Sequence, residues 1–157
     1  MNWLPDPLHP AIVHFPVALA VGAFLLALAA RHRRLSTWDS PAVFLLVLAA
    51  IGSAAAVLTG DAAHDDAVIP TAAAALVGRH EHVGTLAMWV LVGLAAVRLL
   101  LAWGRLWRGA IAWVFVLLIG GSAALVLYNG HLGGQMVYRH GVGTDPVQHA
   151  PQAGDRR

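Results

Sequence analysis

The chain has 157 residues, of which 59% are hydrophobic and only 11% are charged. A soluble domain of this size carries about 25% charged residues, so the composition predicts an integral membrane protein with one domain. The absence of cysteine excludes a disulfide, a cysteine-ligated iron–sulfur cluster and a covalently attached c-type haem. A net charge of only +2 does not indicate a nucleic-acid-binding surface. Any cofactor must therefore be held by nitrogen or oxygen atoms.

Four apolar runs are long enough to cross a bilayer, which takes about 20 residues of helix. They cover residues 11–30, 41–59, 83–103 and 110–128. Pro70 and Thr71 are a further start signal and favour an earlier beginning for the third helix. Tyr128-Asn129-Gly130 predicts the end of the fourth helix. The expected fold is all-α, an integral membrane four-helix bundle with up-down-up-down topology.

We expect one membrane domain over residues 1–145 and a polar tail at 146–157. The connections between runs one and two and between runs three and four are rich in arginine, with Arg31, Arg33, Arg34, Arg105 and Arg108. The positive-inside rule assigns these connections to the cytoplasm, so both termini face outward. No positive charge precedes the first run, which predicts a retained span rather than a cleaved signal peptide. The expected location is the bacterial inner membrane, with the N-terminus in the periplasm.

This topology gathers seven of the nine histidines at the outer side: His9, His14, His64, His80, His82, His131 and His140. His14 lies 17 positions before Arg31, and His82 lies 16 positions before Arg98. At 1.5 Å per helical residue, both are about 24 to 26 Å from the inner boundary. The two histidines are therefore predicted to lie at the same depth.

The leading hypothesis is a b-type haem held by two histidines from different helices. We predict His14 and His82 as the axial pair, with His131 as a third candidate for the iron, and Gly84 making space for the ring. Arginines at the water boundary could pair with the haem propionates. The predicted cofactor-binding set is His14, His82, His131, His140, Arg79, Arg139, Gly84 and Tyr138. The corresponding function is electron transfer without catalysis.

Two alternatives stay open. One is a copper, zinc or nickel site in which His9, His64 and His80 bind the ion with neighbouring acids. Its motif is weak, because His80-Glu81-His82 is not the His-Glu-x-x-His pattern of zinc peptidases. The other is a cofactor-free structural subunit or small-molecule carrier. An enzymatic role finds little support, since the serines within the apolar runs have no neighbouring base in the sequence.

Several motifs resemble the bacterial membrane family called domain of unknown function 2231. They are His9-Pro10-x-x-x-His14-Phe15-Pro16, Thr59-Gly60-Asp61, His82, and Gly130-His131-Leu132-Gly133-Gly134-x-x-Val137-Tyr138-Arg139-His140-Gly141-Val142-Gly143. The resemblance covers about residues 5–145 and implies a four-span module without an established activity. The family's recurring histidines match His9, His14, His82, His131 and His140.

Relatives in that family can be joined to Rieske or c-type cytochrome domains. The resemblance therefore implies a redox setting and favours haem. Because this chain has no fused redox domain, its electron partner would be a separate periplasmic or membrane protein. Homo-oligomerisation is left open by the sequence.

Overall fold

The computed structural model describes residues 8–66, 69–104, 107 and 109–144, and every element in that part of the chain is helical. The elements are α1 (His9–Ile12), α2 (His14–Ala29), η1 (Arg33–Trp38), α3 (Asp39–Asp66), η2 (Thr71–Ala73), α4 (Ala74–Trp103) and α5 (Ala110–His140). Four helical segments are long and apolar enough to cross a membrane: His9–Ala29, Arg34–Asp65, Thr71–Trp103 and Ala110–His140. The predicted all-α, four-span fold is confirmed.

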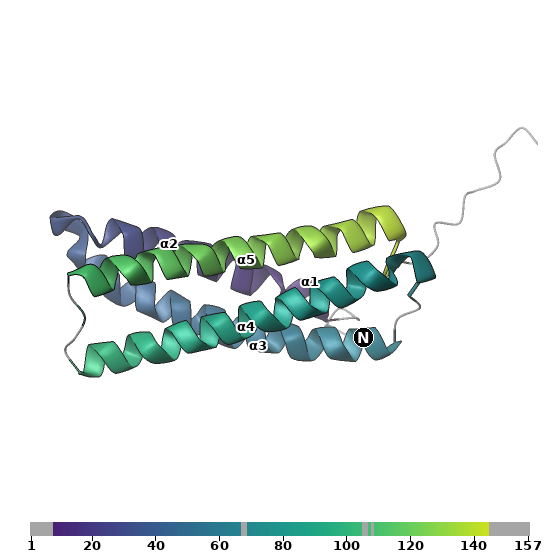
Figure 1. Cartoon of the computed structure of the whole chain (residues 1–157), viewed down its shortest axis with the longest axis horizontal. Helices are drawn as coiled ribbons and strands as arrows, with labels where there is room; N and C mark the ends of the chain where they lie inside the picture. The colour runs from purple at the N-terminus through teal and green to yellow at the C-terminus, as the bar shows by residue number, and fades with distance from the viewer. Residues whose placement is uncertain (1–7, 67–68, 105–106, 108, 145–157) are drawn as a thin grey trace, which may run out of the picture.

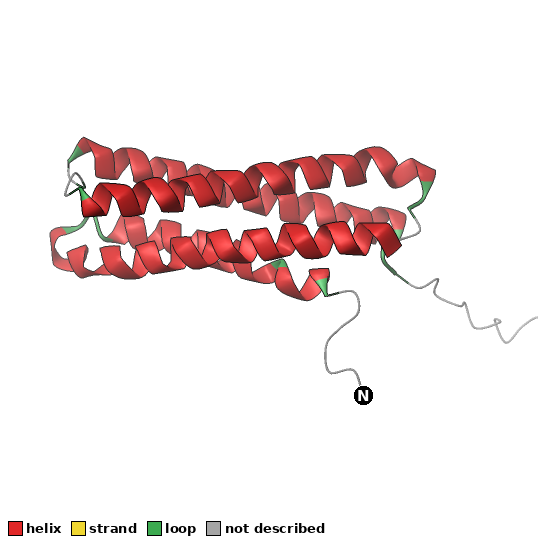
Figure 2. Ribbon diagram, turned by 90° about the horizontal axis from the view of Figure 1, so that it is seen from below, coloured by secondary structure: helices red, strands yellow, loops and turns green. Residues whose placement is uncertain are grey.

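The four long helices form a closed ring (Figures 1 and 2). Each long helix packs on the next one in the chain, and α2 closes the ring by packing on α5. Helices α2 and α4 are therefore diagonal to each other. The short helix α1 precedes α2 and packs on α3. Figure 1 shows the C-terminal end of α5 at the same end of the bundle as the connection from α3 to α4.

The interior of the bundle is built mainly from small side chains. Alanines line it on every long helix, including Ala20, Ala23, Ala49, Ala87 and Ala123. Large apolar side chains point outward instead, as Phe44, Leu58 and Leu117 do. Small inward residues let helices approach closely, and large apolar outer faces suit contact with lipid rather than water. The distribution of side-chain size is that of a membrane bundle.

The first span is two helices rather than the single run predicted from residue 11. A break at Val13 separates α1 from α2. Pro16 has no N–H to donate to the carbonyl of Ile12, and its ring presses against that carbonyl. The helical ladder is therefore interrupted one turn before Pro16, and α1 is a separate four-residue helix.

The third span begins at η2, which confirms the earlier start signalled by Pro70 and Thr71. Helix α3 continues to Asp66, past the end predicted at residue 59. The predicted tail at 146–157 lies outside the described residues.

The predicted end of the fourth helix at Tyr128 is wrong, because α5 continues to His140. Buried residues on both sides of Asn129, such as Val126 and Leu132, keep the helix packed through this stretch, and tertiary packing outweighs a local stop signal. The helix ends at Gly141, whose φ of 64° suits glycine.

Candidate functional site

Two histidines from diagonal spans face each other near one end of the bundle. His9 on α1 and His80 on α4 have ring centroids 6.2 Å apart, with the ring planes at 87°. Both side chains are half-buried. We call this end of the bundle the histidine end. It brings together residues that are far apart in the sequence, as the sequence predicted for spans one and three.

Backbone carbonyls fix the tautomer of both rings. Nδ1 of His9 lies 2.9 Å from the carbonyl oxygen of Ala56, and Nδ1 of His80 lies 3.1 Å from that of Asn129. A carbonyl oxygen has no proton, so Nδ1 must donate in both cases. A neutral ring then keeps its Nε2 lone pair available. This is the usual arrangement of a metal-binding histidine, whose second nitrogen is oriented by a carbonyl or carboxylate.

Helical periodicity explains why these two histidines point inward. His80 lies seven residues before the buried Ala87, and His9 lies seven residues before the buried Pro16. Seven residues are close to two helical turns, so each histidine continues the buried stripe of its span. The same stripe on α5 carries Asn129, seven residues after the buried Ser122.

Asn129 is a third polar group in this layer. Its backbone carbonyl accepts from His80, and its side-chain Oδ1 is buried without a hydrogen-bond partner. A Cβ on Gly84 would lie 3.0 Å from Nδ2 of this amide. The missing side chain at Gly84 therefore makes room for Asn129. Space for a flat ligand at Gly84 stays a prediction, and in this structure the Asn129 amide lies against that glycine.

Glycines also face the two histidine rings. A Cβ on Gly60 would lie 3.0 Å from Cε1 of His9, and a Cβ on Gly133 would lie 3.2 Å from Cε1 of His80. The rings thus lie directly against helix backbone. Helices α3 and α5 can hold the imidazoles only because these positions lack side chains.

The predicted axial pair, His14 and His82, is placed differently. Both side chains are exposed on the outer surface of the bundle. His82 is two residues from His80, and His14 is two residues from Pro16, so each points about 200° away from the buried stripe. Ligation by these two residues remains a prediction, but the ring pair that the structure brings together is His9 and His80.

The other predicted haem contacts also face outward. His131 is exposed and its Nε2 lies 2.6 Å from Nε2 of Gln135, its neighbour one turn along α5. Tyr138 and Arg139 are exposed, and His140 is half-buried at the end of α5. Arg79 lies over the ring of Tyr128, with its guanidinium carbon 6.0 Å from the ring centroid. The structure does not gather these side chains around the histidine pair.

The alternative metal site divides into two parts. His64 pairs with Glu81 through Nδ1 and Oε1, whereas His9 and His80 lie together. The His64 pair lines an open cleft of about 260 Å³ with Asp61 and Asp65. Within residues 8–66, 69–104, 107 and 109–144, no group of three or more histidine, cysteine or acidic side chains is arranged to hold a metal ion.

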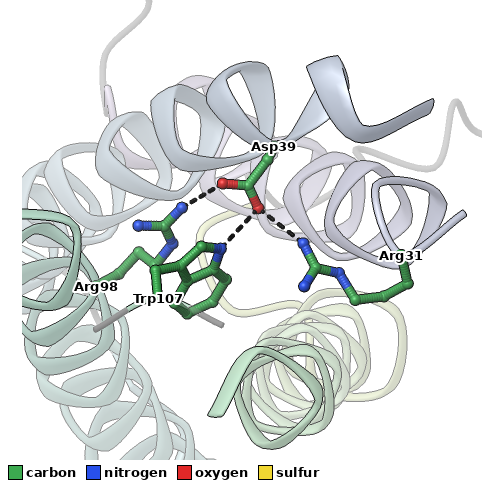
Figure 3. Close-up of polar contacts among 4 residues, drawn as sticks. All are labelled: Arg31, Asp39, Arg98 and Trp107. Carbon is green, nitrogen blue, oxygen red and sulfur yellow. Dashed lines mark hydrogen bonds and ion pairs between the residues drawn. The ribbon is translucent and has the colours of Figure 1, made fainter. Parts of the chain in front are cut away.

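The opposite end of the bundle has a charged cluster, which we call the arginine end (Figure 3). Asp39 accepts from Nη2 of Arg31 at 3.1 Å through Oδ1 and from Nη2 of Arg98 through Oδ2. Nε1 of Trp107 also donates to Oδ1, at 3.2 Å. The guanidinium of Arg98 stacks on the Trp107 ring, 3.6 Å from its centroid. One carboxylate on α3 thus ties together the connection after α2, helix α4 and the connection before α5.

Sequence reasoning missed Asn129 and the role of Asp39 as a hub. Asn129 was assigned to a helix stop, although its spacing from Ser122 and Val126 puts it on the buried stripe. Asp39 could have been recognised from the sequence because it is an acidic residue close to the arginines of the first connection, Arg31, Arg33 and Arg34. A search for inward positions, in addition to depth, would have identified both histidines and Asn129.

The family model described as "Predicted membrane protein (DUF2231)" matches residues 5–146. The chain belongs to this family. The match covers nearly the whole sequence and includes both histidines of the pair, Asn129 and Asp39. It agrees with four helices able to span a membrane, and the protein is a membrane protein. No significant match was found among curated proteins or solved structures.

Proposed function

We propose that this membrane protein is an electron carrier that holds a b-type haem between His9 and His80. The observation behind the proposal is the ring pair itself. A metal bound at roughly 2 Å by the Nε2 atoms of two opposed imidazoles holds their ring centres roughly 6 Å apart. The observed separation is 6.2 Å, and both Nδ1 atoms already donate to carbonyls.

The number of protein ligands favours haem over a zinc or nickel ion. Structural zinc takes four protein ligands and catalytic zinc three, whereas a haem iron needs only one or two axial ligands because the porphyrin supplies the other four. The described residues offer two imidazoles in this layer and no larger metal-binding group. When bound, a haem iron carries one electron by cycling between its ferric and ferrous states.

The chain's own residues would orient and tune that centre. The carbonyls of Ala56 and Asn129 hold the two rings in one tautomer and increase the basicity of Nε2. Thr59 adds a hydroxyl 3.4 Å from Nδ1 of His9. The alanine-lined core below the pair excludes water from the rest of the bundle.

The close packing around the two rings favours a second candidate, a copper(I) ion. Gly60, Gly84 and Gly133 are already in contact with His9, Asn129 and His80. A porphyrin would require the α1–α3 side of the bundle to separate from the α4–α5 side. Copper(I) accepts two nitrogen ligands in a line and needs no such movement, and imidazole is among its ligands.

The proposal includes an orientation. The arginine end would face the cytoplasm, which Arg31, Arg34 and Arg98 support through the positive-inside rule. The histidine end would then face the periplasm of a bacterial inner membrane. A separate periplasmic or membrane redox protein would exchange electrons at that end.

The test uses the full-length protein purified in detergent, with oxidised and dithionite-reduced spectra and metal analysis. Haem predicts a Soret band and reduced α and β bands that are lost in His9→Ala and His80→Ala. The matched controls are His14→Ala and His82→Ala, which remove exposed histidines from the same two spans. They should keep the parent spectrum.

Other outcomes separate the alternatives. A featureless spectrum with one copper per chain, lost in His9→Ala and His80→Ala, supports the second candidate. A spectrum lost in His14→Ala and His82→Ala instead would restore the pair predicted by depth. No haem and no stoichiometric metal in protein supplied with both would overturn the proposal, and the two rings would then be a T-shaped aromatic contact within a cofactor-free subunit.

A further inference from the structure

We infer that the side-chain amide of Asn129 is part of the binding site between His9 and His80, and that its Oδ1 is the acceptor for a polar group that arrives with the bound centre. The inference rests on the proposed function and deepens it. It concerns a residue that none of the sequence motifs assigned to the site.

The first step is the unpaired oxygen. Oδ1 of Asn129 is buried and has no hydrogen-bond partner in the described part of the chain. Leaving a buried acceptor without a donor is unfavourable, and native proteins keep few such groups. Asparagine is also a poorer helix former than the alanine and leucine found at other buried positions of α5, such as Ala123 and Leu132. Packing alone gives no reason for an amide here.

The second step is the location of the amide. The backbone carbonyl of the same residue accepts the hydrogen bond that orients His80, and His80 lies 6.2 Å from His9, centroid to centroid. A neutral imidazole has one N–H group. In His9 that group donates to the carbonyl of Ala56, and in His80 it donates to the carbonyl of Asn129. Nε2 of each ring thus remains available for a metal, and a water or other polar group bound to that metal would supply the donor that Oδ1 of Asn129 lacks.

The third step is the contact between the Asn129 amide and Gly84. Gly84 has no side chain where Asn129 Nδ2 lies, at 3.0 Å from an ideal Cβ. The pair Gly84 and Asn129 thus positions the amide at the level of the histidines. Asn129 acts as a positioning residue through its backbone carbonyl and as an acceptor for the bound centre through Oδ1.

The experiment compares Asn129→Leu with the parent. Leucine has a similar volume and keeps the backbone carbonyl that orients His80. Metal-free protein in detergent is titrated with haemin and, separately, with copper(I), and its thermal midpoint is measured before the titration. We expect the affinity to fall roughly tenfold or more, as for other outer-sphere partners of metal-binding histidines, while the metal-free protein becomes more stable.

The matched control is Ser122→Ala, which also removes a buried polar group from α5. Its hydroxyl is already satisfied, because Oγ donates to the carbonyl of Ile119 at 2.8 Å. Ser122→Ala should leave both affinities unchanged. Rescue by Asn129→Gln is not expected, since the longer chain does not fit the space at Gly84.

The outcomes separate this inference from the proposed function. Binding by Asn129→Leu that equals the parent overturns the inference and leaves the histidine pair intact as the site. A metal-free Asn129→Leu protein that is less stable than the parent overturns it too, because Oδ1 is then satisfied in the free protein. If the parent protein binds neither haemin nor copper(I), the proposed function is overturned, and so is the role of Asn129 at a metal.

Discussion

The two ends of the bundle solve the same problem, a polar group inside a membrane protein, in opposite ways. At the arginine end, both oxygens of Asp39 accept hydrogen bonds from Arg31, Arg98 and Trp107. At the histidine end, Oδ1 of Asn129 is buried without a hydrogen-bond partner among the described residues, and each ring uses Nδ1 and leaves Nε2 available. A cluster whose carboxylate is fully engaged holds helices together, whereas one with free acceptors has capacity to bind. The comparison distinguishes a structural cluster from the candidate site.

The largest expected effect is at the arginine end. Asp39→Asn removes the carboxylate and leaves Arg98, which is 5% exposed, without its counter-charge. Breaking a buried ion pair from one side costs about 3 to 5 kcal/mol, so the thermal midpoint in detergent should fall by many degrees. Asp61→Asn, at an exposed acid of the same helix, is the control. A thermal midpoint of Asp39→Asn equal to that of the parent would mean that the arginine end does not stabilise the bundle.

The next effect is a pH dependence confined to the histidine end. Metal binds the neutral imidazole, so protonation competes with it, and affinity is present above the ordinary histidine pKa of about 6.5 and lost below it. With two rings, affinity should fall up to roughly 100-fold from pH 7.5 to 5.5. The guanidiniums at the other end stay charged throughout. A flat profile would contradict histidine ligation.

A smaller effect tests the contact between Gly84 and the Asn129 amide. Gly84→Ala introduces a Cβ 3.0 Å from Nδ2, so the amide must move, and we expect a destabilisation of about 1 kcal/mol together with weaker binding. Gly93→Ala on the same helix has no atom within 4 Å and should be stabilising by up to about 1 kcal/mol through helix propensity. Thermal midpoints of the pair measure the difference. Equal changes of the thermal midpoint in the same direction for both variants would show that Gly84 does not position the Asn129 amide.

The smallest effect concerns one hydrogen bond. Trp107→Phe keeps an aromatic ring beneath Arg98 but loses the Nε1–H donor to Asp39. Since Asp39 retains both arginines, we expect a loss of about 1 kcal/mol in the unfolding free energy. A loss as large as that of Asp39→Asn would show that the indole, rather than the ion pairs, holds this end together.

The fold could be predicted from the sequence because the features that determine it extend over many residues. Twenty-residue apolar runs and arginine-rich connections determine the number of spans and which ends lie together, and the structure agrees. Depth along each helix could also be counted, because the rise per residue is constant. The even number of spans correctly places the starts of spans one and three at the same end of the bundle, whereas the pairing of His14 with His82 by depth stays a prediction.

The residues of the site could not be fixed by depth alone. His80 and His82 differ by only two positions, about 3 Å in height, but by about 200° in direction. Nearly every position of these helices is apolar, so the hydrophobic pattern does not mark the inward face. The small residues do mark it, since Ala20, Ala23 and Ala27 lie on one stripe with Pro16. In a membrane bundle, residue size indicates the inward face more reliably than hydrophobicity.

The break at Val13 has a consequence for His9. Because Pro16 interrupts the ladder, His9 is carried by a four-residue helix that contacts α3, where its ring lies against Gly60 and donates to the carbonyl of Ala56. One ring of the pair thus belongs to a short helix held by its neighbour, whereas the other belongs to a thirty-residue helix.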